Sequence, residues 1–413
     1  MLDFRPPEDN PFIIGLCKLG LPLILKFKLH DAEVRVIGDG LQRFKSLSGK
    51  RTVICPNHSY RHDPEVMFTL SKYMSEDFNF IAAREVFDWN NGLNGWLLQH
   101  LGCYSVVRGA ADRESFKTTK NIIAAGKKKL VLFPEGEISR QNDVLLPLET
   151  GAVQLSFWAL DELQKTEPDA PVFIQPVALK YTYKRNITSQ LEWCMTKLEK
   201  RLGIDDHNEP SLYKRVRTAA EAVLSALERQ YNCKVPEGAA LNDRMKTVKI
   251  AALKTMAEVL DVELNVKGSQ LDWVRQLRNT MDDFIYGDIE EMSPYQRKMH
   301  EEKAAKIKGY YRDLDRVVSF IAIYDGYLNP PATQERLSNV IELLETEVFG
   351  QISVKGPRLI LVDIGQPINL LPLYTEYKKS KRTLLDSVTS DVTRQLSGML
   401  ETMDKERQPV YVT

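Results

Sequence analysis

The pattern of apolar and polar residues changes character twice along this chain. In the first part, short apolar runs alternate with segments that repeat apolar residues at helical spacing. The apolar runs lie at 33–37, 52–55, 78–82, 103–108, 130–133 and 172–179. Such alternation is typical of a mostly parallel sheet with helices on both of its faces.

Helical spacing dominates from residue 188 to residue 351, and a single apolar run at 358–365 then precedes a last helical stretch. The pattern therefore predicts an α/β fold: a mostly parallel mixed sheet is flanked by helices, with a large all-helical insertion before the last strand. We expect four units along the chain. They are an amphipathic membrane-associating segment at 1–30, an α/β core at 31–187, the helical insertion at 188–353, and a final core strand with a C-terminal helix at 354–413.

The segment from Phe12 to Leu29 consists mainly of Ile, Leu and Phe, but charges and a proline interrupt it. The interrupting residues are Lys18, Pro22, Lys26 and Lys28. A helix that spans a membrane needs about 20 apolar residues with few charges, which this segment does not offer. We expect it to lie in the membrane interface with its lysines at the lipid head groups. The alternative is a buried helix that covers the core.

Composition narrows the choice of partners and compartment. The 413 residues include 56 Lys and Arg against 56 Asp and Glu, so no net positive charge attracts nucleic acid, and attraction to anionic lipid must be local. Hydrophobic residues make up 43% of the chain, which is ample for a globular core. The five cysteines have no paired spacing, which favours reduced thiols in the cytoplasm, and the N-terminus does not resemble a signal peptide.

Candidate chemistry concentrates in the stretch from Asn57 to Asp63, which follows the apolar run at 52–55. Asp63, Pro64 and Glu65 together predict a helix start with Asp63 as the N-cap. His58 would then lie at the carboxyl end of a strand, where open α/β sheets bind their ligands. Asp63 could accept a hydrogen bond from one imidazole nitrogen and leave the other free to take a proton. This is the layout of an oriented general base.

Other interpretations of this stretch remain open on the residues alone. A histidine beside a helix start can simply be a satisfied turn residue. A metal site is not predicted, because Pro64 places the helix start after both His58 and His62 and no third ligand is signalled. The serine-hydrolase elbow G-x-S-x-G and the phosphate loop G-x4-G-K-[ST] are both missing from the sequence.

Further motifs give this stretch a context. They are Asn57–Asp63 (N-H-x4-D), Gly102–Arg108 (a glycine, apolar residues and an arginine), Phe133–Ser139 (F-P-E-G), Gln175–Leu179 (Q-P-V-A-L) and Gly365–Ile368 (G-Q-P-I). In their order and form they resemble the conserved blocks of the glycerolipid acyltransferase family, which contains the 1-acylglycerol-3-phosphate acyltransferases. The resemblance covers about Val34 to Tyr183 and the late strand, and leaves out the helices between 188 and 351.

The resemblance implies a function and roles for individual residues. His58 would remove the proton of an acceptor hydroxyl, and Asp63 would hold the imidazole. The hydroxyl would attack an acyl thioester, either acyl-CoA or an acyl carrier protein, without a metal or redox cofactor. Substrate contacts are expected at Asn57, Arg108, Glu135, Gly136 and Arg140. The expected protein is a cytoplasmic enzyme that associates peripherally with the membrane lipid surface and acylates 1-acyl-sn-glycerol-3-phosphate to phosphatidic acid.

One position departs from the family pattern. The arginine of the third block would fall at position 138, where this chain has Ile138, and Arg140 lies two residues later. Two alternatives therefore stay open beside the expected function. The acceptor could instead be glycerol-3-phosphate or another lysolipid, or the chain could be a catalytically degenerate protein that binds lipid or a partner.

Overall fold

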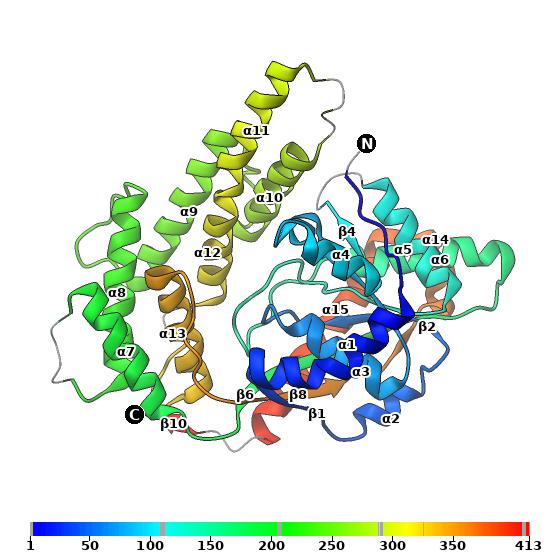
Figure 1. Ribbon diagram of the computed structural model, residues 1–413, viewed down its shortest axis with the longest axis horizontal. Coiled ribbons are helices and arrows are strands. Elements are labelled where there is room, and N and C mark those ends of the chain that lie inside the picture. The colour runs from blue at the N-terminus through cyan, green and yellow to red at the C-terminus, as the bar shows by residue number, and fades with distance from the viewer. Residues whose placement is uncertain are drawn as a thin grey trace.

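The computed structural model describes residues 3–107, 112–204, 209–287, 289, 292–324, 326–406 and 410–412. Within this part of the chain eight strands form a mostly parallel sheet. The sheet lies in the right-hand part of the molecule in Figure 1. The strands are β1 (Asp31–Val36), β2 (Arg51–Pro56), β3 (Phe78–Ala83), β4 (Cys103–Val106), β5 (Lys129–Val131), β6 (Val172–Tyr183), β8 (Arg358–Ile364) and β9 (Ile368–Asn369). The α/β fold predicted from the sequence is confirmed.

The sheet has the strand order β1-β8-β6-β2-β5-β3-β4, and β9 pairs with β6. The run from β6 to β4 is parallel throughout. The late strand β8 lies antiparallel to β6, and β1 lies parallel to β8 at the edge. The strand β2, which leads to His58, is therefore central and has its partners on both sides.

Helices cover both faces of the sheet, which explains why the central strands are continuously apolar. Around the sheet lie α2 (Gly40–Lys45), α3 (Asp63–Met74), α4 (Leu93–His100), α5 (Arg113–Ala125), α6 (Gly151–Thr166), α14 (Tyr374–Lys379), α15 (Lys381–Glu406) and two short 3-10 turns, Arg84–Asp88 and Leu371–Leu373. Val53 and Cys55 of β2 pack with α5, α6 and α15, while Ile54 points to the opposite face and packs with α3.

The chain between β6 and β8 forms a set of helices that stands beside the sheet (Figure 1). They are α7 (Thr188–Leu202), α8 (Leu212–Gln230), α9 (Leu241–Leu260), α10 (Gln270–Tyr286), α11 (Pro294–Lys308), α12 (Tyr310–Ala322) and α13 (Gln334–Phe349). Their apolar faces build two cores, one mainly from α7, α8 and α13 and one mainly from α9, α10 and α12. The end of the chain also returns to these helices, because β10 (Tyr411–Val412) pairs with β7 (Ala332–Thr333).

The N-terminal segment forms α1 (Pro11–Leu23) and a π-helical turn, Ile24–Lys28, beside α3. Its inner side is buried through Ile14, Leu21 and Leu25, and its outer side leaves a row of large apolar residues exposed. The exposed row is Phe12, Leu16, Leu19, Leu23 and Phe27. Lys18 was expected at lipid head groups, but its Nζ lies 2.7 Å from Asp77 Oδ1 and thus points toward the protein. No helix within the described residues is long and apolar enough to cross a membrane.

Candidate active site

The turn between β2 and α3 carries His58 at the carboxyl end of a central strand. Helix α3 begins at Asp63 with Pro64 in its first turn, and the residue at the N-cap is His62. The prediction that Asp63 caps the helix is therefore wrong by one residue. The Asp63 carboxylate instead turns back and accepts a hydrogen bond from the Tyr60 backbone N–H at 2.9 Å. This backward orientation brings the carboxylate to the imidazole.

His58 and Asp63 form a hydrogen-bonded pair. The distance from His58 Nδ1 to Asp63 Oδ2 is 2.8 Å, and Asp63 is completely buried. Because a carboxylate only accepts hydrogen bonds, Nδ1 carries the proton and Nε2 keeps its lone pair. The ring of His58 stacks on Phe133 with 4.1 Å between ring centroids, which fixes its plane. The geometry fits an oriented base, and the catalytic role of both residues stays a prediction.

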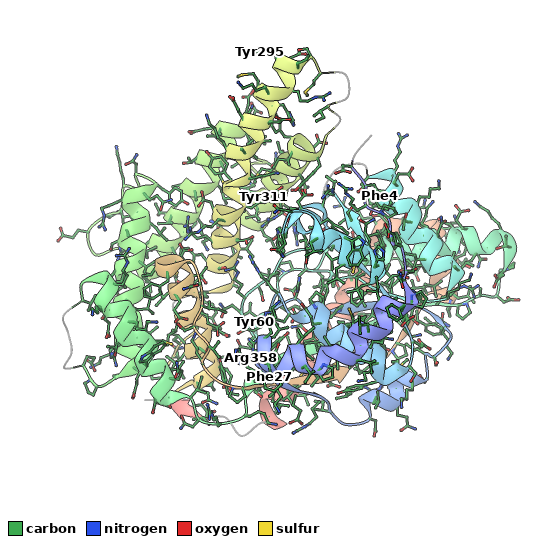
Figure 2. All side chains as sticks on the ribbon, viewed as in Figure 1. Phe4, Phe27, Tyr60, Tyr295, Tyr311 and Arg358 are labelled. Carbon is green, nitrogen blue, oxygen red and sulfur yellow. The ribbon has the colours of Figure 1, made fainter. Side chains whose placement is uncertain are left out.

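Two residues from strands distant in the sequence support the buried side of the His58–Asp63 pair. Tyr181 of β6 donates a hydrogen bond from its hydroxyl to Asp63 Oδ1 at 2.6 Å. Burial raises the pKa of Tyr181 well above its ordinary value, so this hydroxyl stays a donor. Arg358 of β8 lies 4.9 Å from the ring centroids of both Tyr60 and Tyr181, and its Nε bonds Asp31 at 2.7 Å. Figure 2 labels Arg358 next to Tyr60. Tyr181 was not predicted from the sequence, although it follows Leu179, the last residue of the Q-P-V-A-L motif, by two positions and lies on the same face of the strand.

The segment that follows β5 holds the His58 backbone at two points. Oε1 of Glu135 accepts the His58 backbone N–H, and the Ser139 N–H donates to the His58 carbonyl at 2.9 Å. The other carboxylate oxygen of Glu135 accepts the Leu146 N–H at 2.8 Å. Glu135 is completely buried and is not among the residues that line the cavity beside His58. Its geometry is that of a residue that positions the turn, and its contact with substrate stays a prediction.

Glu135 also predicts a dependence of stability on pH. Burial raises the pKa of Glu135 from 4.5 to about 8, although two backbone N–H groups oppose the shift. Between these pH values the folded state retains a proton that the unfolded state has lost, so the free energy of unfolding should fall as pH rises from about 4.5 to about 8, by an amount of the order of a few kcal/mol. We expect Glu135→Gln to remove this fall, as measured by urea unfolding at both ends of the range.

The Glu135→Gln variant also has an expected cost at low pH. Its amide NH₂ must face one of the two backbone N–H donors, which lowers the free energy of unfolding by about 1–3 kcal/mol. A fall with pH as steep in the variant as in the wild type would contradict the assignment to Glu135.

The remaining predicted site residues are Asn57, Gly136, Arg140 and Arg108. Asn57 bonds both the N–H and the carbonyl of Leu179, at 2.7 and 3.1 Å, and so ties the end of β2 to β6. Gly136 and Arg140 line the cavity. Gly136 has a φ of +70°, and a Cβ there would lie 3.1 Å from Glu149 Oε1, which explains the glycine. Arg108 lies outside the described residues.

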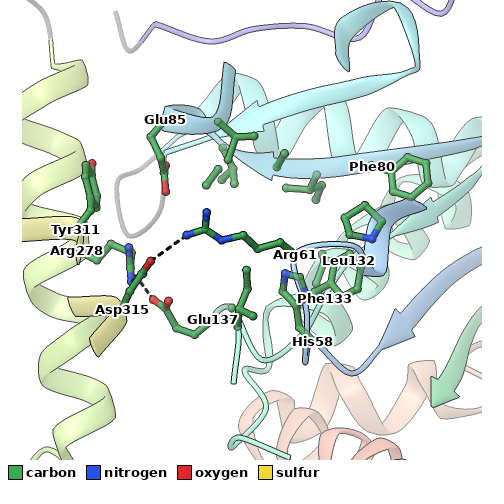
Figure 3. A pocket seen from close by; sticks show the side chains of 18 of the residues that line it. His58, Arg61, Phe80, Glu85, Leu132, Phe133, Glu137, Arg278, Tyr311 and Asp315 are labelled. Atoms are coloured by element: carbon green, nitrogen blue, oxygen red, sulfur yellow. Dashed lines mark hydrogen bonds and ion pairs between the residues drawn. The ribbon is translucent and has the colours of Figure 1, made fainter. Parts of the chain in front are cut away.

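A cavity of about 980 Å³ opens beside His58 between the sheet and the helices that follow it. Its lining differs on the two sides of His58 (Figure 3). Phe80 and Leu132 lie on one side, while Glu85, Glu137, Arg278 and Asp315 lie on the other, toward which Arg61 extends. Further apolar lining comes from Ile81, Leu98, Phe116 and Leu155, and further charged lining from Arg140, Arg312 and Glu347. The contributions of α10 and α12 were not predicted, because helical spacing alone does not say which helix faces the site.

A comparison with protein families bears on the class of this protein. Residues 33–180 match the family model described as Acyltransferase, which supports acyl transfer as the general activity. The match runs from β1 into β6, includes His58 and Asp63, and agrees over this region with the resemblance to the glycerolipid acyltransferase family. Helices α7 to α13 lie outside the match. No curated protein matches the chain.

Proposed function

We propose that the protein transfers an acyl group from an acyl thioester, acyl-CoA or an acylated carrier protein, to the free hydroxyl of 1-acyl-sn-glycerol-3-phosphate, which gives phosphatidic acid. The observation that carries the proposal is the position of the His58–Asp63 pair. His58 of this pair lines a cavity that is apolar on one side and carries several arginines, together with carboxylates, on the other. A lysophospholipid has the same two parts, an acyl chain and an anionic head group.

The bonding at His58 supports a direct transfer. Nε2 of His58 takes the proton of the acceptor hydroxyl while the hydroxyl oxygen attacks the thioester carbonyl carbon. The tetrahedral intermediate collapses as the carbon–sulfur bond breaks, and the leaving thiolate takes the proton back from the imidazolium. The products are an ester and a thiol, and His58 is regenerated. Asp63 stabilises the imidazolium between the two steps, and no acyl-enzyme forms.

The test is an assay of purified protein with isotopically labelled acceptors. 1-Acylglycerol-3-phosphate, glycerol-3-phosphate and lysophosphatidylcholine are each offered with acyl-CoA and with acylated carrier protein. We expect product with 1-acylglycerol-3-phosphate at a higher kcat/KM than with the other acceptors. A preference for glycerol-3-phosphate would replace the proposed acceptor. No product with any pair of substrates would refute the enzyme and favour a lipid-binding protein.

The row of exposed apolar residues on α1 and the π-helical turn after it supports docking to an anionic lipid surface. Phe12, Leu16, Leu19 and Phe27 form part of this row, and all four are exposed although the opposite side of the helix is buried. Lys26 and Lys28 lie at the end of the same segment, where they can meet anionic head groups. Because both the acceptor and the product carry acyl chains, the cavity would exchange them with this surface.

Docking through α1 can be tested without disturbing the core, because Leu16 and Leu19 are exposed. We expect the double variant Leu16→Gln/Leu19→Gln to bind anionic phospholipid vesicles at least about tenfold more weakly, since each leucine contributes about 1.5–3 kcal/mol when fully buried in an apolar medium. Co-sedimentation with vesicles measures the change. The control is Val266→Gln, which replaces an exposed apolar residue between α9 and α10. Undiminished sedimentation of the double variant would contradict the docking surface.

A further inference from the structure

Three arginines meet at the polar end of the cavity around a single aspartate of α12. Nη2 of Arg140 lies 3.2 Å from Asp315 Oδ2, and Nη2 of Arg61 lies 3.5 Å from the same oxygen. Nη2 of Arg278 lies 3.0 Å from Asp315 Oδ1. Figure 3 shows Arg61 extending from the turn of His58 toward Asp315. Asp315 is thus shared by guanidinium groups from the sheet unit and from α10.

Three guanidinium groups share two carboxylates in this cluster, those of Asp315 and Glu137. Arg278 has a carboxylate of its own, because its Nε lies 2.7 Å from Glu137 Oε1. Arg61 and Arg140 share the second carboxylate oxygen of Asp315, Oδ2, and the distance from Arg61 is at the limit of a hydrogen bond. Although burial opposes it, the guanidinium groups of Arg278 and Arg140 lower the pKa of Asp315, so its carboxylate stays charged. Two guanidinium groups therefore compete for one carboxylate oxygen.

Arg61 and Arg140 belong to the two chain segments that hold His58. Arg61 follows His58 by three positions in the same turn, and Arg140 directly follows Ser139, whose N–H bonds the His58 carbonyl at 2.9 Å. Arg140 has a φ of +55°, a conformation that few residues other than glycine adopt. Burial is the main cause that lowers the pKa of Arg140; the carboxylate of Asp315 opposes this shift, and the nearby charge of Arg61 adds to it. A second anion between the two guanidinium groups would relieve that repulsion.

We propose that Arg61 and Arg140 form the binding site for a phosphate monoester, the head group of the acceptor, and that Asp315 is the counter-ion which the phosphate displaces. The proposal rests on the proposed function and names the part of the site that selects the acceptor. A phosphate monoester offers three acceptor oxygens and up to two negative charges, so it can bond both guanidinium groups at once. Asp315 offers them a single oxygen, Oδ2, which must serve both groups and therefore binds each of them less well.

The chemistry of the acceptor agrees with this location. In 1-acylglycerol-3-phosphate the free hydroxyl and the phosphate are carried by neighbouring carbon atoms, so a phosphate site must lie close to the base. Arg61 and Arg140 are attached to the two segments that hold His58. Ile138 lines the same cavity and has no charge to offer a phosphate. The acyl chain then extends past His58 toward Phe80 and Leu132, on the other side of the cavity (Figure 3).

The test measures binding without turnover, in the full chain. The probes are a short-chain, water-soluble 1-acylglycerol-3-phosphate, the matching 1-acylglycerol without phosphate, and free coenzyme A, each titrated calorimetrically in the absence of the other substrate. We expect Arg61→Ala and Arg140→Ala each to weaken binding of the phosphorylated acceptor by about tenfold or more. Binding of 1-acylglycerol and of coenzyme A should not change. Asp315→Asn should strengthen binding of the phosphorylated acceptor several-fold, because it removes the competing anion.

The matched control is Arg312→Ala, which removes a positive charge from the same cavity on the same helix as Asp315. An equal loss of affinity in this variant would overturn the proposal in favour of general electrostatic attraction. A loss confined to coenzyme A would assign the arginines to the donor and also overturn it. Weaker binding by Asp315→Asn would show that Asp315 does not compete with the phosphate. Thermal unfolding midpoints equal to that of the wild type establish that each variant is folded.

The outcome is separable from that of the proposed function. If the wild type forms phosphatidic acid but Arg61→Ala and Arg140→Ala bind the acceptor normally, the phosphate site is refuted and the reaction stands. If the binding pattern holds but no donor gives product, the phosphate site stands and the reaction is refuted.

Discussion

Replacing His58 with alanine is expected to lower kcat for acyl transfer by about 10²–10⁴, the usual contribution of a general base. The acceptor hydroxyl would have to attack with its proton still attached, because the cavity then lacks the Nε2 lone pair that the Asp63 bond leaves free. The change removes a ring that is mostly buried against Phe133, so a modest loss of stability is also expected. KM for both substrates should change little, since the imidazole contributes to the transition state more than to binding.

The rate is measured as labelled phosphatidic acid formed per unit time at saturating substrate. His100→Ala serves as the control, because His100 belongs to α4 and lies outside the residues that line the cavity. Its rate should equal that of the wild type. If His58→Ala retained more than about a tenth of wild-type turnover while folded, His58 would not be the base.

Asp63→Asn is expected to lower kcat by a similar order, about 10³–10⁴, as loss of the buried carboxylate of a histidine–carboxylate pair does elsewhere. The carboxylate accepts three hydrogen bonds, from His58, from the Tyr60 N–H and from the Tyr181 hydroxyl. An amide offers one acceptor oxygen and an NH₂ group. If the NH₂ group takes the place of Oδ2, it faces the Tyr60 N–H and makes Nδ1 of His58 an acceptor, which moves the ring proton to Nε2 and removes the base. If it takes the place of Oδ1, it donates to the Tyr181 hydroxyl, and the neutral amide no longer stabilises the imidazolium.

Two readouts separate this effect from damage to the fold. The thermal unfolding midpoint reports the cost of the altered hydrogen bonds, and kcat at constant KM reports the loss of the correct tautomer. Asp39→Asn is the matched control, because Asp39 lies exposed before α2 and is not among the cavity residues. Full activity of a folded Asp63→Asn variant would contradict the role of Asp63 as the group that orients His58.

Much of the sheet could be predicted because its signals are local. The apolar runs of β2, β3 and β6 are bounded within a few residues, and helices on both faces make them continuous rather than alternating. His58 and Asp63 could be paired in the same way, since five positions of chain and one turn separate them. Local patterns thus supplied the fold class and the centre of the candidate site.

The rest of the site depends on contacts between distant residues, which local patterns do not encode. Tyr181 reaches Asp63 across 118 positions, and Arg140 reaches Asp315 across 175. Glu135 and Asn57 were assigned to substrate from their motifs, whereas their hydrogen bonds to backbone groups became visible only once the strands were placed. The N-cap of α3 differed from its prediction because Asp63 bonds the turn behind it rather than the helix ahead.

The antiparallel pairing of β6 and β8 brings together the two ends of the helical stretch that connects these strands. Tyr183 stands opposite Arg358, and the Lys184 N–H bonds the Pro357 carbonyl at 3.1 Å, so the chain leaves and re-enters the sheet at one point. During synthesis β1 has no neighbour in the sheet until the whole helical stretch has emerged and β8 follows it. Because the cost of closing a loop grows only slowly with its length, this junction would tolerate helical stretches of very different sizes without alteration of the strands that carry His58.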